Sequence, residues 1–232
     1  MNREIYMLDT LWSYLFPPVC PHCGTPVAAE GVWCESCYQE LLHIHSIDMP
    51  WGAPVDRVWI LAHYDGGIKS ILHDIKFNHQ KKQSKWAASF LQSFSLQLAA
   101  CSIEPDIVVP VPSSDKKIEE RGYNQVDILF KEWVRELWIR KGRHYWQWCD
   151  CLTKIDTGRS MWELTKNERS TNVLHTFRLL KDYSDCSKIQ GKNILIVDDI
   201  YTTGATIEAV ATILKDGGAH SIQALTLASG SF

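Results

Sequence analysis

The 232-residue sequence has no long apolar run and no recognisable leader. No segment approaches the roughly 20 consecutive apolar residues that a membrane-spanning helix requires. The first residues carry Glu4 and Asp9 and lack a small-residue cleavage site, which disfavours a secretory signal. We therefore expect a cytoplasmic protein without membrane insertion, in which the eight cysteines do not form a disulfide framework.

The sequence also lacks an excess of charge of either sign. Its formal net charge is −3, which argues against a generally basic surface for coating nucleic acids but allows a local basic groove. Apolar residues make up 45% and charged residues 22%, as in ordinary soluble globular proteins. A chain of this length and composition is expected to form one or two domains with a core of normal size.

The N-terminal segment combines a predicted helix with a cysteine motif. Apolar residues recur at three- and four-residue steps from Ile5 to Leu15, which predicts a short amphipathic helix. Two C-x2-C pairs follow, ten residues apart, with His22 inside the first pair as an alternative ligand. Zinc takes four thiolates in a tetrahedron, and a segment this short depends on the metal for its folding energy. The spacing therefore predicts a structural zinc site formed by Cys20, Cys23, Cys34 and Cys37.

The remainder of the chain has a different pattern. Residues 42–55 contain Pro50, Gly52 and Pro54 and are predicted to form a linker. From there onward, short apolar runs alternate with helical periodicity, which predicts βαβ units. We expect an α/β fold with a mostly parallel sheet flanked by helices in residues 56–232. A small four-Cys zinc-ribbon-like module occupies residues 1–48. The predicted strands are 58–64, 106–111, 144–149, 193–197 and 220–227, and the predicted helices are 68–75, 86–99, 126–137 and 207–215.

The most informative segment runs from Ile194 to Thr206. Four apolar residues predict a buried strand, two aspartates stand at its carboxyl end, and a loop with hydroxyl groups and a glycine precedes a helix. In open α/β sheets ligands bind at this edge, and backbone N–H groups at the start of a helix bind anions. The carboxylates are suited to accept hydrogen bonds from adjacent sugar hydroxyls. The segment therefore predicts a site for a sugar with a terminal phosphate, formed by Asp198, Asp199, Thr202, Thr203, Gly204, Ala205 and Thr206.

This segment resembles the 5-phosphoribosyl 1-pyrophosphate (PRPP) motif of type I phosphoribosyltransferases. Further strings, in the same order along nearly the whole chain, are similar to the ComF family (ComFC and GntX-like proteins). In that family a zinc module is fused to a phosphoribosyltransferase-like domain. The strings are Phe16-Pro17-Pro18 with the cysteines, Tyr64-Asp65-Gly66, Ile68-Lys69, Lys76-Phe77, Val109-Pro110-Val111-Pro112, Arg121-Gly122-Tyr123-Asn124-Gln125, Arg169 with Asn172, and Phe177.

The resemblance assigns roles at the phosphoribosyl end of the site. It implies that Asp198 and Asp199 contact the ribose hydroxyls, that residues 202–206 hold the 5-phosphate, and that magnesium enters with the pyrophosphate. This chain departs from the family at Met161, where a glutamine is usual. The departure weakens the case for turnover more than the case for ligand binding.

The resemblance also assigns the pyrophosphate side. Residues 110–114 are expected to form the loop beside the diphosphate, with positive charge from Lys116, Lys117 and Arg121. Alternatively, Lys116 and Lys117 lie in a loop exposed to solvent and do not contact the diphosphate. Arg121 and Lys76 are the candidates for a catalytic contribution, and a cation at a helix end is the alternative for Lys76.

The sequence leaves the reaction itself open, because it identifies neither an acceptor pocket nor a general base. The alternatives are a PRPP sensor without catalysis and a single-stranded DNA-binding competence factor. The segment from Arg135 to Trp148 interleaves basic and aromatic residues, as single-stranded DNA sites do, although a helix end followed by a buried aromatic strand gives the same pattern. The ComF resemblance implies a role in natural transformation and a helicase-like partner.

Overall fold

The computed structural model describes residues 16–98, 100, 103–141, 145–155, 176–180 and 188–230. The predicted N-terminal helix and the position of Met161 lie outside the described residues, as do Arg169 and Asn172.

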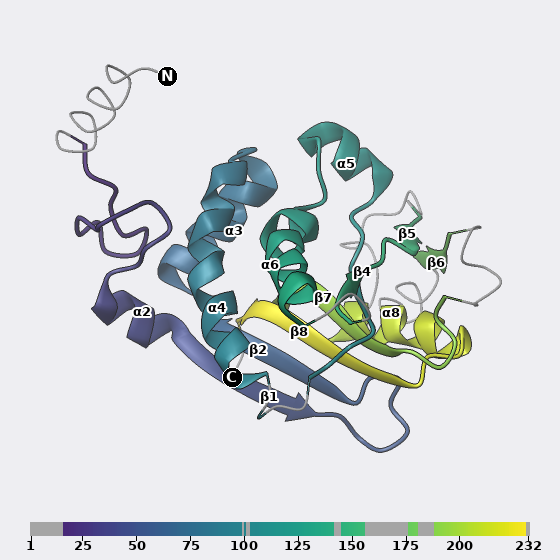
Figure 1. Cartoon of the computed structure of the whole chain (residues 1–232). Helices are drawn as coiled ribbons and strands as arrows, with labels where there is room; N and C mark the ends of the chain where they lie inside the picture. The colour runs from purple at the N-terminus through teal and green to yellow at the C-terminus, as the bar shows by residue number, and fades with distance from the viewer. Residues whose placement is uncertain are drawn as a thin grey trace.

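A six-stranded sheet forms the centre of the molecule (Figure 1). Its order is β1-β2-β8-β7-β3-β4, and every neighbouring pair is parallel except β1 with β2. The mostly parallel sheet predicted from the sequence is therefore confirmed. Its strands are β1 (Leu42–Asp48), β2 (Arg57–His63), β3 (Ile107–Pro110), β4 (Gln147–Trp148), β7 (Asn193–Tyr201) and β8 (Ser221–Ser229).

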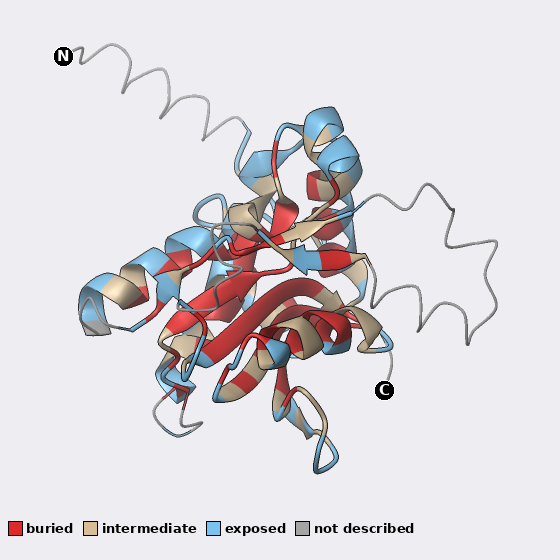
Figure 2. Ribbon diagram, turned by 90° about the vertical axis from the view of Figure 1, so that its right-hand side faces the viewer, coloured by how far each residue is buried: buried red, intermediate tan, exposed pale blue. Residues whose placement is uncertain are grey.

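Helices cover both faces of this sheet, because the side chains of each strand alternate between two cores. On β7, Leu195 and Val197 pack into a core with α3 (Gly66–Phe77), α4 (Ala88–Gln97) and α6 (Gln125–Lys141). Ile194 and Ile196 on the same strand pack into a second core with α8 (Ala205–Asp216). Buried residues are accordingly concentrated along the central strands (Figure 2).

The predicted linker is wrong for its first half. Residues Leu42–Asp48 form β1, which pairs with β2 along the edge of the sheet. A break in register between Leu42 and His45 disturbs the alternation of apolar and polar residues that marks a strand. The edge position leaves this strand only half-buried, so its polar side chains concealed it in the sequence.

Other element boundaries also differ from the prediction. The helix expected over 86–99 begins as a 3-10 segment, Lys81–Ala87, before α4. A short helix that was not predicted, α5 (Asp115–Arg121), follows the expected loop of residues 110–114, and β5 (Leu152–Lys154) pairs with β6 (Phe177–Leu179) in a small antiparallel sheet. Strand β7 continues through both aspartates to Tyr201, because it pairs with β8 over its full length.

The cysteine module packs directly on the α/β fold. The module contains helix α2 (Glu35–Leu41). Two residues of this helix, Cys37 and Leu41, and the earlier Cys20 belong to the same core as α3 and α4. The indole N–H of Trp33 donates to the carbonyl of Trp86 at 2.8 Å. Among the described helices, none combines the length and apolar character needed to cross a membrane.

Candidate functional site

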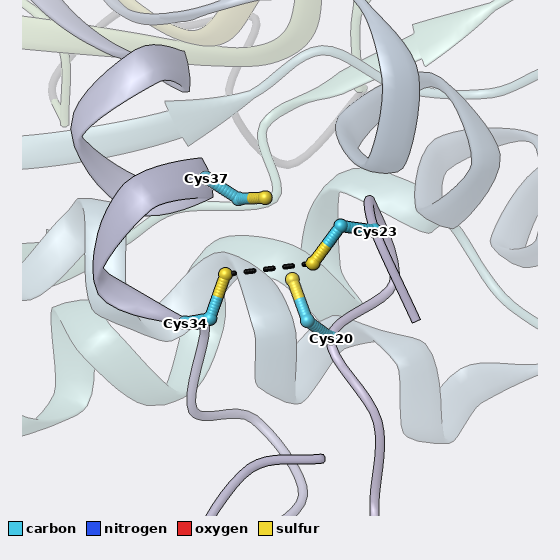
Figure 3. Close-up of side chains that lie close together, drawn as sticks. All are labelled: Cys20, Cys23, Cys34 and Cys37. Atoms are coloured by element: carbon cyan, nitrogen blue, oxygen red, sulfur yellow. Dashed lines mark hydrogen bonds between the residues drawn. The ribbon is translucent and has the colours of Figure 1, made fainter. Parts of the chain in front are cut away.

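The four cysteines predicted as zinc ligands meet at one point. All four Sγ atoms lie within 4.8 Å of one another, and Cys23 Sγ lies 3.6 Å from Cys34 Sγ (Figure 3). A tetrahedral zinc with Zn–S bonds of about 2.3 Å places its sulfur atoms about 3.8 Å apart. The donor set and its spacing therefore fit zinc, and because four protein thiolates complete the shell, the site is structural.

The surroundings of the cysteines favour a thiolate at one ligand. Hydrogen bonds from the side chain and backbone of Thr25, whose hydroxyl lies 3.2 Å from Cys23 Sγ, lower the pKa of Cys23 to about 6. His22, the alternative ligand, accepts a hydrogen bond at Nδ1 from the backbone N–H of Gly67 at 3.1 Å. In this arrangement His22 connects the cysteine module to the start of α3.

A second site lies at the carboxyl ends of β3 and β7. It is a cleft of about 340 Å³ to which several segments distant in the chain contribute. Its lining residues are Tyr64, Lys76, Val111, Pro112, Ser113, Ser114, Lys117, Arg121, Gln125, Val126, Lys154, Asp198, Asp199, Ile200, Thr202 and Thr206. This is the edge at which open α/β sheets bind ligands.

The predicted phosphate loop forms one wall of the cleft. Thr202 and Thr206 line it, whereas Thr203, Gly204 and Ala205 do not appear in the lining. Gly204 has a φ of +80° immediately before α8, and a Cβ there would stand 2.8 Å from the Tyr201 hydroxyl. Glycine is therefore required at this position for the loop to turn into the helix. The result is a helix start with two hydroxyl groups beside the cleft, an arrangement suited to a phosphate.

The acidic pair is buried beside this loop. Asp198 and Asp199 are only 8% and 7% exposed, and both line the cleft. Burial, and then the charge of Asp199, raise the pKa of Asp198 well above the ordinary value of a carboxyl. Asp199 accepts hydrogen bonds from the Gln125 side chain and from the backbone N–H of Ile200. Two buried carboxylates facing a polar cleft are an unfavourable arrangement unless a ligand or cation uses them.

Cations also line the cleft. Lys76, Lys117 and Arg121 all line it, as predicted, whereas Lys116 is exposed on α5 outside it. Lys76 Nζ and Arg121 Cζ lie 6.0 and 5.9 Å from the centre of the Phe77 ring, which places both cations around one aromatic side chain. The cleft thus combines carboxylates, hydroxyls and cations.

Three polar lining residues had no assigned role in the sequence-based prediction. Tyr64 and Gln125 lay within motifs shared with the ComF family, but nothing in the sequence indicated what they contact. Lys154 lay in no sequence motif. It lines the cleft because β5 places it beside Ser114, with which it forms a β-bridge. Their roles depend on contacts between segments distant in the chain.

The aromatic and basic segment near Trp148 is mostly packed. Trp146 is completely buried, with its ring centre 5.5 Å from that of Trp133, so its faces are not available for stacking with bases. Trp148 is half-buried and donates its indole N–H to Asp150 at 2.9 Å. Trp146 is therefore a core residue, as the alternative of a buried aromatic strand predicts, whereas Trp148 is partly accessible at the surface.

Comparisons with known proteins agree with the two parts of the structure. Residues 11–48 match the Double zinc ribbon domain family, and residues 150–231 match the Phosphoribosyl transferase domain family. The chain is 27% identical over 214 residues to DNA utilization protein YhgH of Escherichia coli, covering 88% of this chain and 81% of that protein.

Two further relatives are named as competence proteins. Competence protein ComFC of Bacillus subtilis is 28% identical over 219 residues, covering 90% of this chain and 77% of that protein. Competence protein F of Haemophilus influenzae is 23% identical over 219 residues, covering 91% and 84%. The resemblance to the ComF family, the phosphoribosyltransferase-like fold and the four-cysteine zinc ribbon are therefore confirmed.

Proposed function

Because the chain is a homologue of the ComF proteins with a zinc ribbon and a phosphoribosyl transferase domain, we propose that its cleft binds PRPP with magnesium. The observation that carries this proposal is the composition of the cleft, which combines carboxylates and hydroxyls (Asp198, Asp199, Thr202 and Thr206) with cations (Lys76, Lys117 and Arg121). A sugar phosphate with a diphosphate at its far end needs both kinds of group.

Each part of PRPP has a complementary group in the cleft. The hydroxyls of Thr202 and Thr206 and the start of α8 hold the 5-phosphate, while the acidic pair accepts hydrogen bonds from the ribose hydroxyls. The diphosphate faces Ser113, Ser114 and the cations. The carboxylate oxygens of the pair also suit magnesium, which prefers oxygen ligands shared with phosphates and neutralises the diphosphate when bound.

We extend the proposal to the cellular setting that the relatives' names suggest. In this proposal the protein works in the cytoplasm in a process that utilizes DNA. A helicase-like partner remains a prediction. The carboxylates among the described lining residues are Asp198 and Asp199, which the proposal assigns to the ribose hydroxyls. We therefore propose binding of the phosphoribosyl ligand without assigning an acceptor or a general base for transfer.

Calorimetric titration of PRPP with magnesium tests this function. The wild type is expected to bind saturably, and an Asp198→Ala/Asp199→Ala variant is expected to lose ~100-fold or more of its affinity, since the ribose hydroxyls lose their charged acceptors. Asp216→Ala, an exposed carboxylate at the end of α8, is the matched control and should bind as the wild type does. A folded, zinc-loaded wild type that does not bind PRPP would refute the proposal.

Single-stranded DNA binding is a second candidate, supported by one surface feature. A groove of about 540 Å³ is lined by Lys131, Arg135, Trp138 and Trp148, and Lys131 Nζ lies 5.5 Å from the centre of the Trp148 ring. A base stacked on Trp148 would bring its phosphate near these cations. Affinity for an oligonucleotide should fall with salt and fall further in Trp148→Ala. A salt-independent or absent interaction removes this candidate.

A further inference from the structure

Gln125 connects a cation and a carboxylate of the cleft. It stands at the start of α6 and is only 7% exposed. Its Oε1 accepts a hydrogen bond from Arg121 Nη1 at 2.9 Å, and its Nε2 donates to Asp199 Oδ2 at 2.5 Å. Four of the six buried polar side chains among the described residues line this cleft, and Gln125 is the one that touches both a cation and a carboxylate.

These two contacts fix the direction of the Gln125 amide. A rotation by 180° would place its carbonyl oxygen against the Asp199 carboxylate and its NH2 group against the Arg121 guanidinium, and both encounters are repulsive. Arg121 therefore keeps the NH2 group of Gln125 facing Asp199. The side chain acts as a donor to the acidic pair for as long as Arg121 is in place.

The donation decides how Asp199 is held. Its Oδ1 accepts the backbone N–H of Ile200 at 2.9 Å, and its Oδ2 accepts from Gln125. These two hydrogen bonds, one to each oxygen, hold the plane of the carboxylate, and a remaining lone pair can accept from a hydroxyl of the ligand. Asp198 differs, because its Oδ1 accepts the backbone N–H of Asp199 at 2.9 Å. The pair is thus a rigid receptor for two adjacent hydroxyls.

We propose that Gln125 is a positioning residue that makes the acidic pair select ribose 5-phosphates over 2-deoxyribose 5-phosphates. This inference rests on the proposed function. When a ligand lacks its 2-hydroxyl, one lone pair of the buried carboxylate has no donor. An unpaired buried acceptor lowers the affinity for that ligand strongly. If Gln125 is removed, the carboxylate can rotate or take a water molecule, so the missing hydroxyl costs less.

The test measures the ratio of affinities for ribose 5-phosphate and 2-deoxyribose 5-phosphate by calorimetry. The wild type is expected to prefer ribose by about tenfold or more. Gln125→Met keeps the approximate size of the side chain but has no donor for Asp199, so the ratio is expected to fall at least threefold. Gln125→Ala should act in the same direction, and Gln97→Ala, an exposed glutamine on α4, should leave the ratio unchanged.

Arg121→Ala provides an independent arm. Neither sugar carries a diphosphate, so any loss of overall affinity from the missing cation cancels in the ratio, and a fall in the ratio reports the freed Gln125 amide. A wild type that prefers ribose while all three variants keep its full preference would overturn the inference and leave the proposed function intact. A wild type that binds neither sugar phosphate nor PRPP would overturn both. Thermal melting confirms that each variant is folded.

Discussion

At the scale of single residues, the cleft contains buried carboxyl groups of a kind that usually lies on the protein surface. Asp198 and Asp199 are buried at the end of a strand, and the raised pKa of Asp198 reports the free energy that this burial costs. A carboxyl of this kind destabilises the unliganded protein at neutral pH. Buried ionisable groups of this kind cluster at functional sites, which makes the pair a candidate for contacts with a ligand.

Replacing Asp198 by Asn is therefore expected to stabilise the unliganded protein while abolishing PRPP binding. The gain at neutral pH should be about 1 kcal/mol, or about 2–4 °C in Tm, because a buried charge is removed and the acceptor for the Asp199 N–H is kept. A raised pKa means that the wild-type carboxyl contributes most at low pH and loses this contribution as pH rises through its folded pKa. The difference in Tm should consequently grow with pH, and thermal melting over a pH series measures it. Equal Tm values throughout would contradict this account.

The two neighbouring lysines of α5 offer a matched comparison. Lys117 lines the cleft and Lys116 does not, although both are exposed. Lys117→Ala is expected to weaken PRPP binding about tenfold, since a cation beside the diphosphate is lost, and to weaken ribose 5-phosphate binding much less. Lys116→Ala should leave both affinities unchanged in calorimetry. Similar losses from both substitutions would show that only the general charge of the helix matters.

At the scale of elements, the contact between the cysteine module and α3 is determined by two glycines. Gly66 has a φ of +42°, and a Cβ there would lie 2.0 Å from His22 Nδ1. A Cβ on Gly67 would lie 2.8 Å from the Trp33 ring. These positions follow Tyr64, which lines the cleft, so the module packs against the same turn that forms part of the ligand site.

Gly66→Ala is expected to destabilise the protein by about 2 kcal/mol or more, because it combines a positive φ with a steric clash. The result should be a fall in Tm of about 4–8 °C. Gly52→Ala is the control. Gly52 also has a positive φ, +89°, but a Cβ added there would meet nothing within 4 Å. This variant therefore measures the cost of the backbone conformation without a steric clash. Equal losses in the two variants would show that the contact with His22 carries no energy.

At the scale of the whole molecule, the zinc ribbon and the sheet share one core. Cys20 and Cys37 are buried together with residues of β2, α3 and α4, and Lys85 pairs with Glu30 at 2.7 Å across the same contact. Loss of the metal would leave four thiols facing one another and release α2 from this core. The module is therefore expected to unfold together with the helices that cover it.

Removal of zinc with a chelator is expected to lower the Tm of the entire chain by about 10 °C or more, in a single transition, since metal binding supplies several kcal/mol of folding free energy. Cys23→Ser should reduce the bound zinc and the Tm in the same way, whereas Cys149→Ala, a buried cysteine outside the cluster, should keep its zinc. Metal analysis and calorimetry measure both quantities. A separate low-temperature transition for the module, with the main transition unchanged, would contradict a shared core.

Much of the site was predictable because its signals are local. The spacing of four cysteines determined the zinc ligands, and the string from Ile194 to Thr206 contains a strand, a carboxylate pair and a helix start within thirteen residues. In such segments, short-range geometry alone brings the groups together. The prediction failed where the signal was not local: β1 was concealed by its half-buried edge position, and α5 was too short to show a period.

The sequence by itself determined the α/β class, the four-cysteine zinc ribbon and the strand–loop–helix segment from Ile194 to Thr206, since each depends on periodicity or spacing between near neighbours. Only the tertiary structure decided which distant side chains share the cleft. Tyr64, Gln125 and Lys154 reach it from three separate segments, and the amide of Gln125 gains its direction from Arg121 and Asp199 together. The tertiary structure also decided that Trp146 is buried in the core. Contacts of this kind depend on how the strands are ordered in the sheet, which no short stretch of sequence specifies.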